Sequence, residues 1–193
     1  MWAAVRFHFQ CGAILLKLKL EAETISEVWM PALAPGKAAP EVSLHDMEGK
    51  SFSLRNALQH GPVVLAFFKV TCPVCQYAMP FVERLYRAHK DHARIVGISQ
   101  HPRKETAQFR REYGITLPTL LDDQDTYPAS NAYGLTNVPT VFLIAPGGKI
   151  EISSVGWNKK DLQEINRRLA HVASVPAPPV FHRGEDVIDY KAG

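Results

Sequence analysis

The segment from Val63 to Cys75 restricts the fold of this chain more than any other part of the sequence. It begins with an unbroken apolar run, 63–68, whose length and lack of alternation are typical of a strand buried on both faces. The run leads almost directly into Cys72-Pro73-Val74-Cys75, and the residues that follow have helical spacing. We therefore expect two thiols at a strand-to-helix junction, spaced so that a disulfide can form and break within one helical turn.

The start of a helix is a favourable place for a thiolate. Backbone N–H groups without helical partners and the helix dipole both stabilise a negative charge there. Cys72, at or just before the first turn, is therefore the expected nucleophile. Pro73 suits the first helical position, where its missing N–H costs nothing. Cys75 lies one turn further on and is expected to be buried, which makes it the expected resolving thiol.

The cysteine pair has two alternative interpretations. Two cysteines can pack in a buried helix without a chemical role, or they can supply half of a zinc site. Structural zinc needs four ligands, and the third cysteine, Cys11, has no pair of His residues at ligand spacing near it. His89 and His92 are too closely spaced for such a pair and are expected at the solvated end of the helix that follows Cys75. We expect neither a metal nor an organic cofactor.

Composition and charge describe a single soluble domain with extra residues at its ends. The 193 residues are 46% hydrophobic and 21% charged, and the net charge of +3 is too small to indicate binding of nucleic acid. No segment approaches the ~20 apolar residues that span a membrane. Near the N-terminus His8 and Gln10 interrupt an apolar run. We therefore expect no export signal and a cytoplasmic protein, with export to the periplasm as the alternative.

Strand-like and helix-like segments alternate along the chain, which predicts an α/β fold of layers with a final antiparallel hairpin. The main domain is expected at 38–172, between an N-terminal extension, 1–37, and a proline-rich tail, 173–193, that lies on the surface or is partly disordered. A turn is expected at 46–50, a solvated turn at 122–125, and a kink at Pro80. The expected strands are 13–20, 51–54, 63–69, 94–99, 117–121, 141–145 and 149–155, and the expected helices begin after Cys72 and Pro102 and lie at 127–133 and 159–171.

A second chemical element is Pro139, which comes just before the predicted buried strand 141–145. A proline at this position cannot donate a backbone hydrogen bond to the sheet. The motif alone does not establish a special role, because only ~5–6% of X-Pro bonds are cis and many prolines simply begin a strand.

Together these motifs resemble the redoxin branch of the thioredoxin superfamily. This branch includes the TlpA- and ResA-like thiol-disulfide oxidoreductases and the alkyl hydroperoxide reductase/thiol-specific antioxidant proteins. The resemblance covers about residues 38–171 and implies a three-layer thioredoxin-like fold with a central mixed sheet, in which 100–125 is the redoxin insertion. The matching residues are Ala39-Pro40-Glu41-Val42-Ser43-Leu44, Gly49-Lys50, Cys72 with Cys75, Pro80, Val96-Gly97-Ile98-Ser99 and Val138-Pro139-Thr140.

The resemblance also assigns roles around the cysteines. It implies that Pro139 is cis and packs against the two sulfur atoms, and that the backbone of Val138 pairs with an extended segment of the partner. Thr71 and Pro73, which flank the first cysteine, are expected to help to position that segment. Lys69 is a candidate for electrostatic tuning of the thiolate, or else a solvated lysine at the end of the strand.

Two features depart from the family patterns. Thioredoxins carry a buried acid six residues before the first cysteine, where this chain has Ala66, so the proton acceptor for Cys75 is not identified. Peroxiredoxin sites resemble Pro-x-x-x-Thr-x-x-Cys. Counted back from Cys72, the Pro and Thr positions hold Leu65 and Lys69, and the register counted from the second cysteine fits no better.

These observations favour a thiol-disulfide oxidoreductase in which Cys72 attacks and Cys75 resolves a mixed disulfide. Its expected partners are protein thiols and disulfides and an electron-donating reductant. One alternative is a thiol peroxidase that reduces peroxides through a sulfenic acid on either cysteine. The other is a non-catalytic binding or zinc-holding module.

Overall fold

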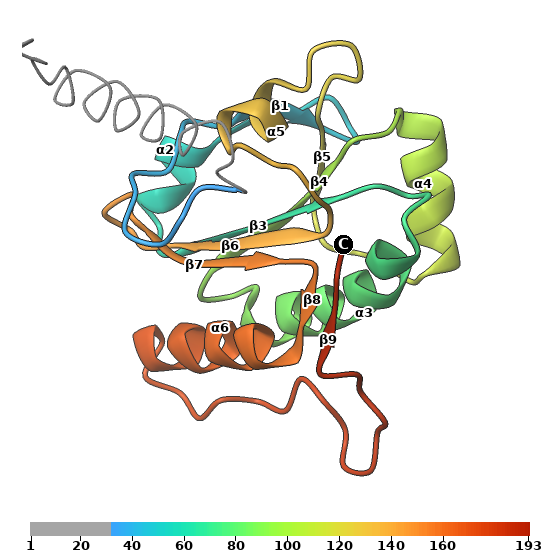
Figure 1. Cartoon of the computed structure of the whole chain (residues 1–193). Helices are drawn as coiled ribbons and strands as arrows, with labels where there is room; N and C mark the ends of the chain where they lie inside the picture. Colours follow the sequence, from blue (N-terminus) through green and yellow to red (C-terminus); the bar gives the residue numbers. More distant parts are fainter. Residues whose placement is uncertain (1–31) are drawn as a thin grey trace, which may run out of the picture. The chain divides into compact units, whose positions relative to one another are not determined.

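A mixed β-sheet forms the centre of the structure, a computed structural model that describes residues 32–193 (Figure 1). Seven strands lie in the order β2-β1-β5-β4-β3-β6-β7. The expected strand 13–20 and most of the expected N-terminal extension lie outside the described residues. The strands are β1 Ser43–Asp46, β2 Ser51–Ser53, β3 Val63–Phe68, β4 Arg94–Ser99, β5 Thr119–Leu121, β6 Thr140–Ile144 and β7 Ile150–Val155.

Strand β3 carries the apolar run and lies in the interior of the sheet. It pairs in parallel with β4 and antiparallel with β6, and every residue of the strand is buried. Helices cover both faces of the sheet, which is why the run lacks the apolar–polar alternation of a half-exposed strand. The expected hairpin is confirmed, because β6 and β7 pair antiparallel. The fold is therefore an α/β layer structure with a central mixed sheet.

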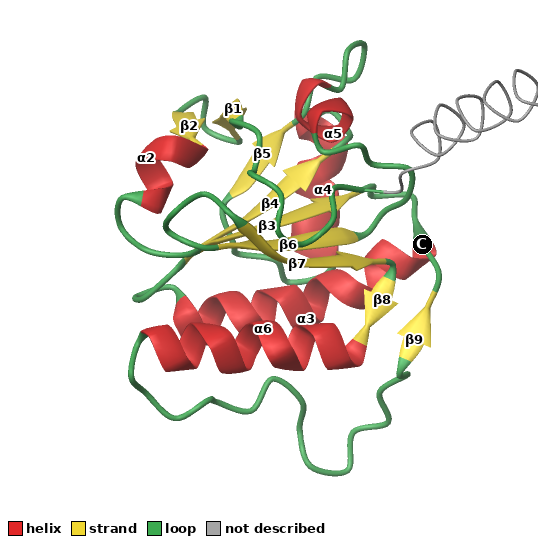
Figure 2. Cartoon of the chain, turned by 60° about the vertical axis from the view of Figure 1, so that its left-hand side comes forward, coloured by secondary structure: helices red, strands yellow, loops and turns green. Residues whose placement is uncertain are grey.

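Two long helices, α3 and α6, lie side by side below the sheet in Figures 1 and 2. The short helices α2 and α5 lie toward the other side of the sheet. Helix α2 was not expected: Ser53 ends β2 and caps α2 by accepting the N–H of Asn56 at 3.3 Å. The helices are α2 Leu54–Leu58, α3 Pro73–His89, α4 Arg103–Glu112, α5 Pro128–Ala132 and α6 Lys159–Val172.

Two polar residues that the sequence places in solvent are buried. His89 lies inside the packing of α3 against α6, with its Nε2 2.7 Å from the side-chain oxygen of Asn166. Asp122 is also buried and accepts the N–H groups of Ala129 and Ser130 at the start of α5. The predictions are wrong at these two residues only, because His92 and 123–125 are exposed as expected. Helix α6, which is distant in sequence, covers His89, whereas α5 follows Asp122 closely along the chain and uses its carboxylate.

The tail 173–193 lies on the surface and is held there by specific contacts. Phe181 packs against the aromatic rings of Phe81 and Trp157. Arg84 of α3 forms two hydrogen bonds with Glu185, at 2.7 and 2.9 Å. The tail then forms a strand, β9 (Tyr190–Lys191), which pairs antiparallel with β8 (Trp157–Asn158). Figure 1 shows this last segment, in dark red, ending beside the start of α3.

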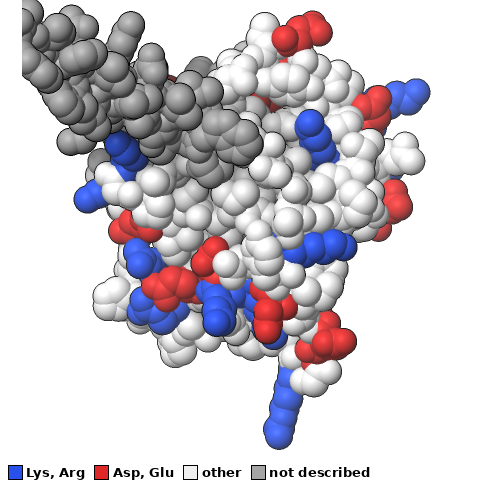
Figure 3. All heavy atoms as spheres, viewed as in Figure 1, with Lys and Arg blue, Asp and Glu red and all other residues white. Residues whose placement is uncertain are grey.

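Charged side chains of both signs are interspersed over the face shown in Figure 3, with no continuous basic or acidic area. Within residues 32–193, no helix has both the length and the apolar character needed to cross a bilayer.

Candidate active site

The first cysteine lies at the N-terminus of α3. Cys72 is the N-cap residue, with extended backbone dihedrals, and its Sγ accepts the backbone N–H of Cys75 at 3.3 Å. Pro73 occupies the first turn, as expected. A thiolate at this position receives an N–H group that has no partner within the helix, together with the positive end of the helix dipole. The two thiols are free and are not joined as a disulfide.

Burial distinguishes the two thiols. Cys72 is partly exposed, whereas Cys75 is completely buried. Burial raises the pKa of the Cys75 thiol well above its ordinary range of about 8.5. Two neighbouring side chains also act on the pKa of Cys75. Cys72 raises it further, and the ammonium group of Lys69 lowers it. Ala66, at the position of the thioredoxin acid, is buried in the middle of β3.

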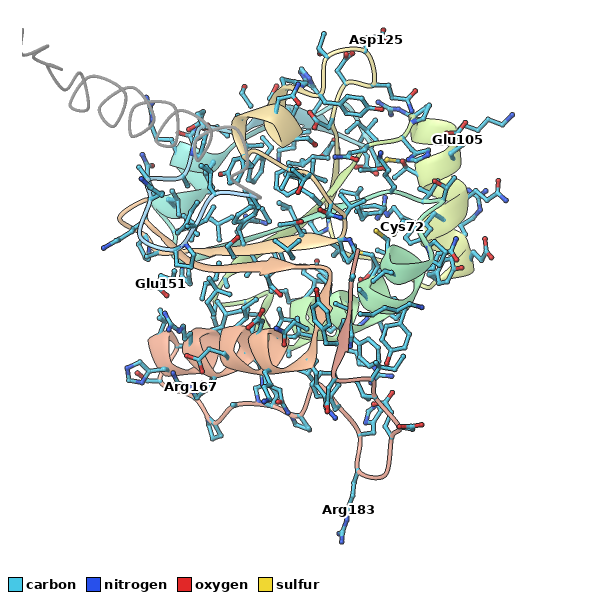
Figure 4. All side chains as sticks on the ribbon, viewed as in Figure 1. Cys72, Glu105, Asp125, Glu151, Arg167 and Arg183 are labelled. Carbon is cyan, nitrogen blue, oxygen red and sulfur yellow. The ribbon has the colours of Figure 1, made fainter. Side chains whose placement is uncertain are left out.

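A loop distant in sequence completes the surroundings of Cys72. The Val138–Pro139 peptide bond is cis, which confirms that expectation. The Cys72 thiol donates a hydrogen bond to the carbonyl oxygen of Val138 at 3.4 Å. The Thr140 hydroxyl donates to the carbonyl of Asn137 at 2.7 Å, which holds this loop at the start of β6. Figure 4 shows Cys72 at the start of α3, close to the beginning of β6.

The other predicted site residues lie around this pair with different exposure. Thr71 and Pro73 are exposed beside the first cysteine, so a partner can reach them. Lys69 is exposed and lines a cavity of about 180 Å³, together with Gln100, Ser130 and Val138. The side-chain amide of Gln100 donates to the Ser130 hydroxyl at 2.7 Å. The cavity wall is therefore largely polar on the side of Lys69.

Sequence reasoning missed one neighbour of the site. The Asn137 side-chain amide donates to the carbonyl oxygen of Gly193 at 2.9 Å, which places the end of the tail against the loop that contains Val138. Nothing in the local sequence of the tail indicates this contact, because it depends on the path of the chain after α6. Among residues 32–193 no three His, Cys, Asp or Glu side chains gather in an arrangement that could hold a metal ion.

Comparison with known proteins agrees with this arrangement. Residues 35–153 match the model of the AhpC/TSA family. The thiol-disulfide oxidoreductase ResA of Geobacillus thermodenitrificans is 32% identical over 136 residues, which cover 69% of this chain and 76% of the relative. ResA of Geobacillus kaustophilus is 30% identical over 143 residues, which cover 73% of this chain and 79% of the relative.

A solved structure has the same fold. The thioredoxin domain of a thiol-disulfide oxidoreductase from Bacteroides vulgatus superimposes with a TM-score of 0.63 and 25% identity, over 71% of this chain and 98% of that domain. The family match, the ResA relatives and the shared fold all indicate thiol-disulfide exchange. The chain belongs to the AhpC/TSA family, within the ResA-like branch of thiol-disulfide oxidoreductases that have a thioredoxin-like fold.

Proposed function

We propose that Cys72 is the thiol that exchanges with the partner and that Cys75 resolves the mixed disulfide. The observation that carries this assignment is the asymmetry of the pair. Cys72 is reachable from solvent and its sulfur accepts a helix N-terminal N–H at 3.3 Å, whereas Cys75 is fully buried and burial raises its pKa. A partner disulfide therefore meets Cys72 first, and Cys75 reacts only after a sulfur has been brought to it.

In the reducing direction the Cys72 thiolate attacks one sulfur of a partner disulfide. A bond forms between Cys72 and that sulfur, and the other partner sulfur leaves as a thiolate that takes up a proton. Cys75 then loses its proton and attacks Cys72, and the remaining partner sulfur leaves in the same way. The partner disulfide has gained two electrons and become two thiols, while Cys72 and Cys75 have become a disulfide. A dithiol reductant restores the starting state, and the same steps in reverse oxidise a partner dithiol.

Val138 and Pro139 position the partner in this proposal. The Val138 carbonyl lies 3.4 Å from the Cys72 sulfur, so an extended segment that pairs with the backbone at this position brings its own sulfur beside the nucleophile. Thr71 and Pro73, which flank Cys72 in the sequence, are exposed and complete the contact surface in this proposal. Lys69 tunes the electrostatics of the second cysteine, because its ammonium favours negative charge at the Cys75 sulfur and lowers the pKa of that thiol.

The test compares wild-type protein with Cys72→Ser and Cys75→Ser, each reacted with a protein disulfide and, separately, with hydrogen peroxide. We expect wild type to exchange disulfides, Cys72→Ser to be inactive, and Cys75→Ser to accumulate a mixed disulfide that mass spectrometry detects. If Cys75→Ser instead turns over as wild type does, the assigned roles are wrong. Fast consumption of peroxide that depends on either cysteine would identify a peroxidase instead.

A further inference from the structure

The last residues of the described chain lie on the surface where the proposed function places the partner. Beyond the contact between Asn137 and the Gly193 carbonyl, residues 190–193 lie along β8 and the start of β6 (Figures 1 and 2). A Cβ atom added to Gly193 would lie 2.5 Å from the Val138 carbonyl oxygen, the same oxygen that accepts from the Cys72 thiol. The backbone of the tail therefore lies in close contact with the carbonyl that an extended partner is expected to use.

Two glycines allow this close approach. Gly156, between β7 and β8, has a φ of 75°, and a Cβ there would lie 2.6 Å from the Lys191 carbonyl oxygen and 2.9 Å from the Gly193 nitrogen. Real Cβ atoms do not approach backbone atoms so closely. The backbone of the tail thus contacts the backbone of the loop before β8 directly. A residue with a Cβ atom would not fit at either glycine without moving the tail.

The preceding part of the tail holds 190–193 in this place. The Ile188 N–H donates to the Tyr77 hydroxyl at 3.0 Å, and the Lys159 N–H donates to the Asp189 carbonyl at 2.9 Å. Val187 is buried. By contrast, β9 itself is exposed and pairs with two residues of β8, so it can separate without disturbing the core.

We infer that residues 190–193 occupy part of the partner-docking surface at Val138 and thereby determine which disulfides the chain accepts. This inference rests on the proposed role of Val138. An extended protein segment must displace the tail before it pairs with this backbone. Its apparent affinity is therefore the intrinsic affinity multiplied by the fraction of molecules in which the tail has left this surface. A small disulfide that needs no backbone pairing reaches the partly exposed Cys72 without that displacement. The intact chain therefore discriminates against extended protein disulfides.

The test measures single-turnover rates of the reduced protein with insulin, as the protein disulfide, and with 5,5′-dithiobis(2-nitrobenzoate), as the small one. Three variants are compared with wild type: deletion of residues 190–193, Gly193→Ala and Arg183→Ala. The deletion leaves the anchoring contacts of 187–189 in place. Gly193→Ala displaces the last residue from Val138 within the full chain. Arg183 is an exposed tail residue that points away from the site in Figure 4, so Arg183→Ala is the matched control.

We expect the deletion to raise the rate with insulin by about fivefold or more, relative to the rate with the small disulfide, as the loss of a weak competing contact predicts. Gly193→Ala should change the ratio in the same direction, and Arg183→Ala should leave it at the wild-type value. An unchanged ratio in the deletion, an equal rise for both disulfides, or the same rise in Arg183→Ala would overturn the inference while leaving the roles of the cysteines intact. If the wild type and all variants react with neither disulfide, the proposed function fails and this inference fails with it.

Discussion

Single residues at the site differ in burial rather than in chemical type. Cys72 and Cys75 are the same amino acid three positions apart, yet one caps a helix at the surface and the other is enclosed. The cap gives the first sulfur a backbone N–H at 3.3 Å, and burial keeps the proton on the second. In the proposed exchange reaction, this difference assigns the first step to Cys72 and the second to Cys75.

The first prediction concerns alkylation of the reduced protein at neutral pH. Iodoacetamide should modify Cys72 and leave Cys75 unmodified until the protein is unfolded, because Cys75 is both inaccessible and protonated. Mass spectrometry of proteolytic peptides resolves the two positions and also separates them from Cys11. Equal labelling rates in the folded protein would contradict the assignment.

The second prediction follows from the raised pKa of Cys75. Between the ordinary thiol pKa of about 8.5 and the higher folded value, the unfolded state has lost a proton that the folded state keeps. The stabilisation from this group is therefore fully present below about pH 8.5 and decreases as the pH rises above it. The free energy of unfolding of the reduced protein should fall by up to about 1.4 kcal/mol per pH unit from this group. Denaturant unfolding of Cys75→Ala at pH 8 to 10 should show a shallower fall, and identical slopes would rule the effect out.

At the scale of elements, Glu83 joins helix α3 to the loop before β5. Its carboxylate accepts the N–H groups of Thr116 and Leu117, both at 2.8 Å, as well as the Thr116 hydroxyl and the Arg87 guanidinium. Burial alone would raise the pKa of Glu83, but these hydrogen bonds outweigh it and the pKa is lowered. One side chain thus satisfies two backbone donors of a segment that packs beside the central strands.

Replacement of Glu83 should therefore destabilise the protein. We expect Glu83→Ala to cost about 2–4 kcal/mol in the free energy of unfolding, because it leaves the buried N–H of Leu117 and the part-buried N–H of Thr116 without an acceptor. Arg87→Ala is the control: its side chain is 61% exposed, so its loss should cost less than about 1 kcal/mol. Because the folded pKa of Glu83 is lowered, its contribution should be lost as the pH falls below about 4.3. Urea unfolding of both variants checks the difference, and similar losses would refute it.

At the scale of the whole described unit, the tail crosses the layer of α3 and α6 and returns to the active-site end of the sheet. Arg84 holds the tail in the middle of this path through Glu185 and through the Val180 carbonyl at 3.2 Å. The hydrogen bonds from Arg84 and from the His182 N–H lower the pKa of Glu185 to about 2. Phe181 adds an apolar contact with Phe81. Strand β9 therefore reaches the site through contacts that lie far from the cysteines.

Loss of the Arg84 contact should loosen the tail without unfolding the domain. In Arg84→Ala, the amide hydrogens of 185–191 should exchange faster with solvent, including that of Ile188, which is bonded to the Tyr77 hydroxyl in the wild type. Arg167→Ala removes an exposed ion pair with Glu164 on α6 and should leave tail exchange unchanged. Hydrogen exchange followed by mass spectrometry measures the exchange of the tail amides in both variants. Unchanged exchange in Arg84→Ala would contradict the prediction and show that the other contacts are sufficient to hold the tail.

Much of the fold and the centre of the site could be predicted from local patterns. The run 63–69 became β3 at Val63–Phe68, and the pattern at 159–171 became α6 at Lys159–Val172, because burial on one or both faces leaves a periodic signature. The cysteine positions followed from the strand-to-helix junction, and the resemblance to redoxins supplied the cis bond before Pro139. Helix α2 escaped prediction because it is five residues long and begins where a strand pattern ends.

The sequence by itself determined the chemistry of this protein: a cysteine pair at a helix start, a proline before a buried strand, and the layers that hold them. These features depend on residues close together along the chain, where propensity and spacing act directly. Tertiary structure alone decided which groups meet across long separations, including the burial of His89 by α6 and the contact between Gly193 and the loop at Val138. Such contacts arise from the packing of whole elements, and no local pattern of the residues involved encodes them.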